Sequence, residues 1–175
     1  MALKPDLEQV LVCRLAAGDA AAYGQLYDRY AAAMLRTGTT MLGSVHDAQD
    51  AVQEVFLAVA RGRRRLAAVR NLRAYLFTAL RRQCARQSVR RRRHATAAAA
   101  TVQAEPTTQQ QGDGPDDRLT RALSALPDEQ REVLTLKIDG GMTFAELAAV
   151  LGISPNTAAS RYRYALAKLR ASLET

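Results

Sequence analysis

The chain of 175 residues has no tryptophan, two cysteines and two histidines, and only 5% of its residues are aromatic. Cys13, Cys84, His46 and His94 stand far apart, whereas zinc ligands usually come in pairs two to five residues apart. The sequence also lacks a glycine-rich phosphate loop and a Ser/His/Asp arrangement for nucleophilic catalysis. We therefore expect no metal, no cofactor and no enzymatic activity.

Long apolar segments are missing as well. The longest stretch without a charged residue covers positions 147–160 and contains Gly152 and Pro155, whereas a transmembrane helix needs about 20 apolar residues. The first residues do not contain the apolar segment of a secretory signal. Two unpaired cysteines fit a reducing compartment. We expect a cytoplasmic protein with no membrane insertion.

Acidic residues are absent from one long segment. Positions 61–93 contain 13 arginines and no Asp or Glu, and the whole chain has a net charge of +8. Because like charges at this density repel one another, we interpret the segment as too cationic to be neutralised inside the protein. The planar guanidinium suits phosphate oxygens and base edges. The segment therefore predicts a polyanionic partner.

Apolar residues recur at helical spacing, and no long period-2 run indicates a sheet. We predict an all-α protein. In its first half, Gly18 ends a short helix and Asp19 caps a second one, which breaks over residues 37–44. Further helices are expected over about 47–61 and 72–92, with a flexible loop at 61–65.

Composition changes over residues 95–117, where Gln, Thr, Gly and Pro are frequent and apolar periodicity disappears. Such a segment buries too little apolar surface to offset its chain entropy, so we predict a flexible linker. Its first six residues could extend the preceding helix, because alanine is the best helix former. The linker separates a domain at 1–94 from a domain at 118–175. On such a tether, the two domains could bind distant parts of one long ligand.

The C-terminal domain has the pattern of a helix-turn-helix. Thr143, followed by Glu146 three residues later, predicts a capping box, and Ser154 followed by Pro155 predicts the start of the second helix. Short helical pairs of this kind also occur in proteins that do not bind DNA. In a DNA-binding helix, outward residues of the first turns read base edges. For Arg161, phosphate binding and a purely solubilising role are equally open.

Two aromatic residues, Tyr75 and Phe77, lie within the arginine-rich segment. Rings among arginines suit single-stranded DNA, because unstacked bases stack on rings while cations bind phosphates. Both residues could instead be ordinary core residues. We favour the core for Phe77 and leave both interpretations open for Tyr75.

Three segments, in this order, resemble the extracytoplasmic-function (ECF) sigma factors of bacterial RNA polymerase. DAQDAVQEVFL at 47–57 resembles their polymerase-binding segment, and NLRAYL at 71–76 is similar to the segment that opens the −10 element. LPDEQREVL at 126–134, with SRYRYAL at 160–166, resembles their −35-binding module. The last segment is also similar to response-regulator-type activators. The first segment is more specific to the ECF sigma factors than the last one, and so is the order of all three segments.

The resemblance implies two small helical domains joined by a flexible linker, in an alternative sigma factor that binds core RNA polymerase, directs it to promoter DNA and helps to open the strands. An anti-sigma factor is a further candidate partner. The candidate residues for binding core polymerase are Asp50, Gln53, Glu54 and Phe56. Those for the −10 element and strand opening are Arg63, Arg64, Arg65, Asn71, Arg73, Tyr75, Arg81 and Arg82. Those for the −35 element are Asn156, Thr157, Ala159, Ser160, Arg161, Arg163 and Tyr164.

Two alternatives to a sigma factor come from other classes of protein. A two-module helix-turn-helix regulator that acts without stable polymerase association would have no need of the polar stripe formed by Asp50, Gln53 and Glu54. That stripe is, however, also what an ordinary solvated helix face looks like. A nucleic-acid-processing enzyme would need metal ligands or carboxylate clusters, which the sequence does not suggest.

Overall fold

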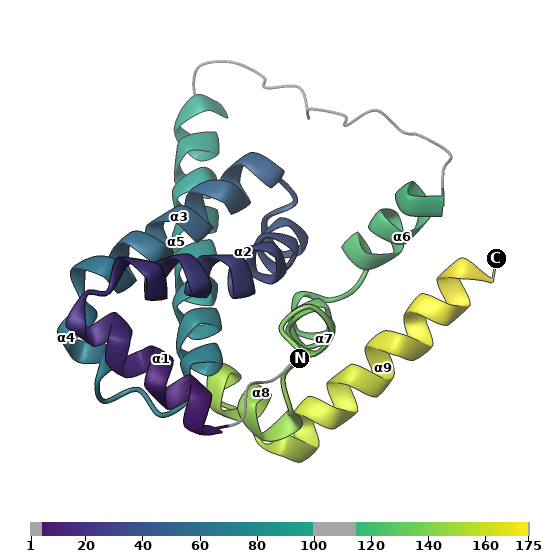
Figure 1. Ribbon diagram of the computed structural model, residues 1–175. Helices are drawn as coiled ribbons and strands as arrows, with labels where there is room; N and C mark the ends of the chain where they lie inside the picture. The colour runs from purple at the N-terminus through teal and green to yellow at the C-terminus, as the bar shows by residue number, and fades with distance from the viewer. Residues whose placement is uncertain (1–4, 100–114, 175) are drawn as a thin grey trace.

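The computed structural model describes residues 5–99 and 115–174, and all regular elements in these ranges are helices (Figure 1). They are α1 (Pro5–Ala17), α2 (Ala20–Leu42), α3 (Val45–Arg61), α4 (Arg63–Leu66), α5 (Leu72–Ala99), α6 (Pro115–Ser124), α7 (Asp128–Ile138), α8 (Phe144–Leu151) and α9 (Pro155–Leu173). We refer to α1–α5 as the N-terminal module and to α6–α9 as the C-terminal module. The predicted all-α fold class is confirmed.

The predicted linker, residues 95–117, is only partly described. Residues 95–99 continue α5, as the alanine run allows, and residues 115–117 form the first turn of α6. The middle of the predicted linker, 100–114, lies outside the described residues.

Most helix ends follow local signals in the sequence. Asp19 caps α2, because its carboxylate accepts a hydrogen bond from the backbone N–H of Ala21 at 2.9 Å. Thr143 and Glu146 form the predicted capping box at the start of α8. Ser154 caps α9 and is followed by proline at the first helical position. These short-range predictions are confirmed.

The predicted break over residues 37–44 is too long, because only Gly43 and Ser44 separate the two helices. Helix α2 continues to Leu42 and ends at Gly43, which adopts the left-handed φ of 67° that favours glycine. Gly38 is buried inside the helix, and a Cβ atom at this position would lie 3.1 Å from the Cβ atom of Ala48 in α3. The glycine therefore allows α2 and α3 to approach closely, and it does not end the helix.

The arginine-rich stretch before α5 is not a loop, which is a second correction. Residues 63–66 form one helical turn, α4, and the backbone N–H of Arg65 donates to the carbonyl oxygen of Gly62. This turn packs against α1, and Leu66 is fully buried. A single apolar residue after three arginines has no periodicity, so the sequence pattern could not predict this helical turn.

The core of the N-terminal module lies between α1, α2, α3 and α5. Leu15, Leu26 and Met34 are completely buried there, and full burial of one such side chain contributes about 1.5–3 kcal/mol to folding. Phe77 of α5 is also buried, so the favoured interpretation of this residue is confirmed. Tyr75, one half-turn earlier, is only half-buried.

The two modules pack against each other. Helix α5 contacts α8, and α2 contacts α7, which Figure 1 shows as α7 and α8 lying beside the N-terminal module. One apolar cluster contains Leu72 and Phe77 of α5 together with Leu136 of α7, Met142 of the turn before α8, and Val150 of α8. A second cluster, which joins α6, α7 and α9, contains Ala122, Leu126, Leu134, Ala165 and Leu169. The modules of this structure therefore share a core instead of standing apart.

The two cysteines occupy different environments. Cys13 is exposed on α1, whereas Cys84 is buried in α5. Burial is the main cause that raises the pKa of the Cys84 thiol, to about 12, because the thiolate is poorly solvated there. At neutral pH the Cys84 thiol is therefore protonated and packed in the core.

Candidate nucleic-acid interface

Helix α3 presents a polar stripe to solvent. Asp50, Gln53 and Glu54 are all exposed, while Val52 and Val55 on the other side of the helix are buried. Positions three and four residues apart lie on one face of an α-helix, so the three polar side chains form a continuous surface. The predicted stripe therefore exists and is accessible.

An apolar groove lies beside this stripe, between α2 and α3. Its volume is about 860 Å³, and its lining includes Tyr27, Leu35, Gln53, Phe56 and Leu57. Phe56 is half-buried, and the centroid of its ring is 5.1 Å from that of Tyr27. Tyr27 is 57% exposed and Leu57 36%. The contribution of α2 could not be predicted from the sequence, because Tyr27 has the spacing of an ordinary core residue.

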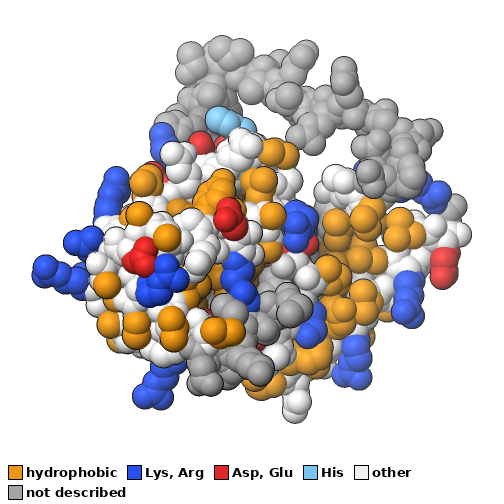
Figure 2. Space-filling view, in the orientation of Figure 1, with side chains coloured by type: hydrophobic (Ala, Val, Ile, Leu, Met, Phe, Trp, Pro, Cys, Tyr) orange, Lys and Arg blue, Asp and Glu red, His pale blue; other side chains and the backbone are white. Residues whose placement is uncertain are grey.

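Arginines surround the turn between α3 and α5. Arg63, Arg64 and Arg65 are all exposed, and together with Arg61 they line a cavity of about 670 Å³. Figure 2 shows Lys and Arg side chains projecting around the outer margin of the molecule. Four guanidinium groups at one turn make a site of strong positive potential, which suits a phosphate backbone.

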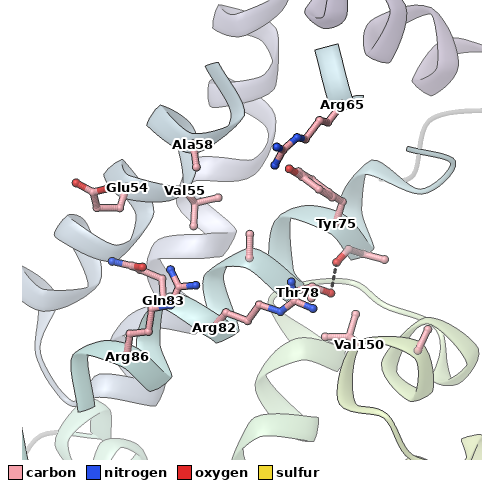
Figure 3. Close-up of a pocket in the computed structure, with 13 residues that line it drawn as sticks. Glu54, Val55, Ala58, Arg65, Tyr75, Thr78, Arg82, Gln83, Arg86 and Val150 are labelled. Carbon is pink, nitrogen blue, oxygen red and sulfur yellow. Dashed lines mark hydrogen bonds between the residues drawn. The ribbon is translucent and has the colours of Figure 1, made fainter. Parts of the chain in front are cut away.

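A further cavity of about 640 Å³ lies along α5 (Figure 3). The α5 residues that line it include Tyr75, Thr78, Arg82 and Arg86. In Figure 3 the guanidinium of Arg65 points toward the hydroxyl end of Tyr75. A ring beside arginines is the arrangement that suits an unstacked base with its phosphate.

Thr78 and Arg86, which also line this cavity, are not among the predicted site residues. Positions 75, 78, 82 and 86 follow one another by three, four and four residues, which places them on one helix face. This spacing from Tyr75 is the signal that could have identified them.

The prediction that the arginine-rich segment cannot be neutralised within the protein is wrong for Arg81 and Arg91, which pair with carboxylates. Arg81 donates to the carboxylate of Glu132 at 2.6 Å, and Arg91 donates to Asp47 at 3.2 Å. Arg73 donates to the carbonyl oxygen of Gly141 at 2.6 Å. The acceptors come from α3, from α7 and from the turn before α8, so they are distant in the sequence, and composition within the segment could not reveal them.

Asn71 connects the start of α5 to the C-terminal module. Its side-chain oxygen accepts from the backbone N–H of Ala74 at 2.8 Å, and its amide group donates to Glu146 at 2.7 Å. Burial raises the pKa of Glu146, but hydrogen bonds from Thr143 and Asn71 and the nearby Arg73 outweigh it, so the pKa is lowered overall. Glu146 is therefore ionised at neutral pH.

Helix α9 presents its first turns to solvent. Asn156, Thr157, Arg163 and Tyr164 are exposed, whereas Ala159 and Ser160 are half-buried. Arg163 donates to the hydroxyl of Ser160 at 3.3 Å. The exposed side chains include an amide, a guanidinium and a hydroxyl, which can pair with base edges in a major groove.

Arg161 makes a contact that neither of its two predicted roles, phosphate binding or keeping the helix soluble, includes. Its guanidinium is 2.5 Å from the carboxylate of Glu129 in α7. The side chain is 27% exposed, so Arg161 joins α9 to α7 in this structure.

Two findings concern only residues 5–99 and 115–174. No group of three or more His, Cys, Asp or Glu side chains in these ranges is placed to hold a metal ion. No helix within them has the length and apolar character that crossing a membrane would require.

The fold and these surfaces define an all-helical protein with two modules, each with a cationic or helix-turn-helix surface for nucleic acid. Residues 26–94 match the family model for sigma-70 region 2, and residues 116–169 match the model for sigma-70 region 4. The chain is 32% identical over 164 residues to the ECF RNA polymerase sigma factor SigL of Mycobacterium tuberculosis, covering 91% of this chain and 93% of SigL.

Solved structures have the same fold. The chain is similar to CnrH in complex with the cytosolic domain of CnrY, with a TM-score of 0.72, 30% identity and coverage of 95% of this chain and 96% of that one. It is also similar to the sigma factor RpoE of Bartonella quintana, in complex with the anti-sigma factor NepR, with a TM-score of 0.73, 23% identity and coverage of 87% and 97%. The chain belongs to the ECF family of sigma factors: it is an alternative sigma factor that directs RNA polymerase to promoters.

Proposed function

We propose that the domain at residues 1–94 binds core polymerase and the −10 element, and that the domain at residues 118–175 binds the −35 element. The segment 95–117 would be the connection between them. The chain itself catalyses no reaction, because the polymerase catalyses RNA synthesis and the sigma factor selects the promoter. It acts in the cytoplasm, where polymerase and promoter DNA are found.

For core polymerase we propose the polar stripe of Asp50, Gln53 and Glu54, together with Phe56 in the adjacent groove. The observation that supports this assignment is the exposure of the whole stripe beside a groove with exposed aromatic and aliphatic side chains. An interface of this kind combines a central apolar anchor with a polar rim.

The test is the double variant Gln53→Ala/Glu54→Ala. It should lose stable binding to purified core polymerase in a pull-down, because it removes contacts without removing any buried group. The control is Gln9→Ala/Glu174→Ala, which removes the same residue types at exposed positions on α1 and beyond α9. Normal retention of a folded Gln53→Ala/Glu54→Ala variant would refute the assignment.

For strand opening we propose Arg63, Arg64 and Arg65 of α4, Asn71 just before α5, and Arg73, Tyr75, Arg81 and Arg82 of α5. Support comes from the cavity along α5, which places the ring of Tyr75 among guanidinium groups of Arg65, Arg82 and Arg86. The arginines would bind the phosphates of one strand while an unstacked base packs on the ring.

For the −35 element we propose the first turns of α9, with Asn156, Ser160 and Arg163 toward base edges. Ala159 and Tyr164 would pack against the wall of the DNA major groove. Thr157 would lie near a phosphate at the N-terminus of α9. Arg161 would contribute to phosphate binding after leaving Glu129. The capped start of α9 and the exposure of its outer face support this assignment.

We also propose an anti-sigma factor as a protein partner. The groove between α2 and α3 supports it, since Tyr27 and Leu57 there are large exposed apolar residues. A partner helix with an apolar face would fill this groove and cover the stripe that we assign to core polymerase.

A further inference from the structure

Helix α1 lies outside the part of the chain that matches sigma-70 region 2, yet it contacts the elements that we assign to strand opening. The match begins at residue 26, whereas α1 covers Pro5–Ala17. This helix packs against α4, which carries three of the proposed arginines, and Figure 1 shows α1 beside α4. No residue of α1 belongs to the surfaces proposed for DNA or polymerase, so its contacts point to an indirect role.

A side chain of α1 caps the start of α5. The carboxylate of Glu8 accepts a hydrogen bond at 2.7 Å from the backbone N–H of Leu72, the first residue of α5. The first N–H groups of a helix have no partner within it. Asn71 satisfies that of Ala74 locally, whereas the acceptor for Leu72 comes from 64 residues earlier. A carboxylate also complements the positive end of the helix dipole. We call this contact the Glu8 cap.

The Glu8 cap acts on the turn that carries candidate residues for strand opening. Arg73 and Tyr75 follow Leu72 by one and three residues, so they lie in the first turn of α5. Residues 67–71 before this turn form no helix, and contacts at the start of α5 therefore set its direction. The Leu72 side chain is completely buried in the same apolar cluster as Leu15 of α1. Helix α1 thus holds Leu72 by its backbone and by its side chain.

Helix α1 and the residue after it also position α4. Leu66 of α4 is completely buried in the apolar cluster that contains Val12 and Leu15 of α1. Gly18 has a φ of +83°, and a Cβ atom there would lie 3.2 Å from the Cζ atom of Arg63. A larger residue at Gly18 would displace this guanidinium. The same helix therefore contacts both elements, α4 and α5, that line the cavity with Arg65 and Tyr75.

We propose that Glu8 is a positioning residue for strand opening. Through its bond to Leu72 it holds the first turn of α5 in place, and with it the ring of Tyr75 opposite Arg65. Without the Glu8 cap this turn would fray, and the ring would lose its fixed position among the arginines. This inference rests on the proposed assignment of α4 and α5 to strand opening.

The test compares Glu8→Ala with Glu8→Gln in the full chain bound to purified core polymerase. Both variants remove the same negative charge, so a general attraction to DNA would strengthen binding equally in the two. Only Glu8→Gln keeps a side-chain oxygen that can accept from the N–H of Leu72. The control is Gln9→Ala, which changes the neighbouring exposed position of α1.

Three quantities are measured. Amide hydrogen exchange of residues 72–76 in the free chain should become about threefold to tenfold faster in Glu8→Ala, the size expected from loss of one helix cap. Permanganate reactivity of unpaired thymines, on a promoter that the parent holoenzyme selects from a library, should fall by a similar factor. Duplex binding to that promoter should change by less than about twofold, because α9 is distant from the substitution. Glu8→Gln and Gln9→Ala should resemble the parent in all three.

Several results would overturn the role of Glu8. Unchanged amide exchange in Glu8→Ala would show that the cap contributes nothing to the first turn of α5. Equal losses of strand opening and duplex binding would show a general defect of the fold. Equal effects of Glu8→Ala and Glu8→Gln would show that the charge matters and the acceptor does not.

The variant Tyr75→Ala separates the role of Glu8 from the assignment on which it rests. If Tyr75→Ala lowers strand opening and Glu8→Ala does not, only the role of Glu8 is overturned. If Tyr75→Ala leaves strand opening unchanged, the assignment of α5 to strand opening has failed, and the proposed role of Glu8 fails with it.

Discussion

Helices α5 and α9 both carry candidate DNA-binding residues, but they differ in what surrounds them. On α9, Asn156, Arg163 and Tyr164 face solvent, so duplex DNA could reach them without any rearrangement. On α5, Arg73 and Arg81 are half-buried and bonded to the C-terminal module. In one conformation of the chain, the surface proposed for duplex recognition is therefore open, whereas part of the surface proposed for strand opening is covered. This difference predicts that −35 docking can precede exposure of the −10 surface.

The largest expected effect concerns the buried side of α5. Phe77→Ala should lower the free energy of unfolding by about 3–5 kcal/mol, because it leaves a cavity in the core that both modules share. Tyr164→Ala on the exposed face of α9 is the matched aromatic control, and it should change that free energy by less than about 0.5 kcal/mol. Urea denaturation followed by circular dichroism measures both. Similar losses of unfolding free energy for the two variants would contradict the contrast between a buried side of α5 and an exposed face of α9.

The second effect concerns the arginines that precede α5. Replacement of Arg63, Arg64 and Arg65 with Gln should flatten the plot of log affinity for promoter DNA against log salt by about two to three units, since each phosphate contact contributes about 0.7–0.9. Arg170→Gln on α9 should change the slope by about one unit at most.

Permanganate footprinting of unpaired thymines tests the division of labour on the same triple variant. Loss of strand opening with normal −35 docking would sharpen the distinction between α5 and α9. Collapse of duplex binding with unchanged opening would instead make these arginines a general DNA anchor.

The third effect concerns base recognition by α9. Arg163→Ala should cost about 1–3 kcal/mol at one base pair of the −35 element and relax the preference there. Arg170→Ala, further along the same helix, should weaken all sites equally if it contributes. Binding to a panel of single-base variants of the site measures both. An equal loss on matched and mismatched sites would show that Arg163 contacts phosphate only.

The smallest effect depends on pH and concerns Glu146, where α5 and α8 meet. Its pKa is lowered in the folded chain, so its contribution to stability is complete above the ordinary glutamate pKa of about 4.5 and is lost as the pH falls through the folded value. Glu146→Gln should cost about 0.5–1 kcal/mol at pH 7, as expected for a weakened cap.

The measurement for Glu146→Gln is the free energy of unfolding at several pH values. The difference from the parent chain should shrink toward zero as the pH falls through the lowered pKa of Glu146, because the parent carboxyl is then protonated as well. A difference that is independent of pH would mean that Glu146 acts through its size and not through its charge.

The sequence predicted what short-range signals control. Asp19, Thr143 and Ser154 cap helices by contacts within three residues, and their caps are present as expected. The polar stripe on α3 also follows from helical spacing alone. Features that depend on distant residues were not predictable in this way. Gly38 is inside a helix because Ala48 packs on it, which composition cannot indicate.

The contacts between the modules are the clearest case of this limit. The acceptors of Arg73 and Arg81 lie 68 and 51 residues further along the chain, so a segment without acidic residues was interpreted as having no internal partner. Leu72 and Met142 belong to one shared cluster, which nothing in the local sequence pattern around either residue indicates. The exposure of the stripe on α3 could be predicted from the sequence, whereas the partial burial of Arg73 and Arg81 on α5 could not.

The contrast between Cys13 and Cys84 gives the native chain a single position for thiol chemistry. Maleimides react with the thiolate, and the raised pKa and burial of Cys84 keep its sulfur protonated and out of reach at neutral pH. Cys13 is exposed on α1, which packs against α2 and α4 and has no place in the proposed DNA or polymerase surfaces. A dye attached there would report on the protein in a transcription reaction without any engineered cysteine.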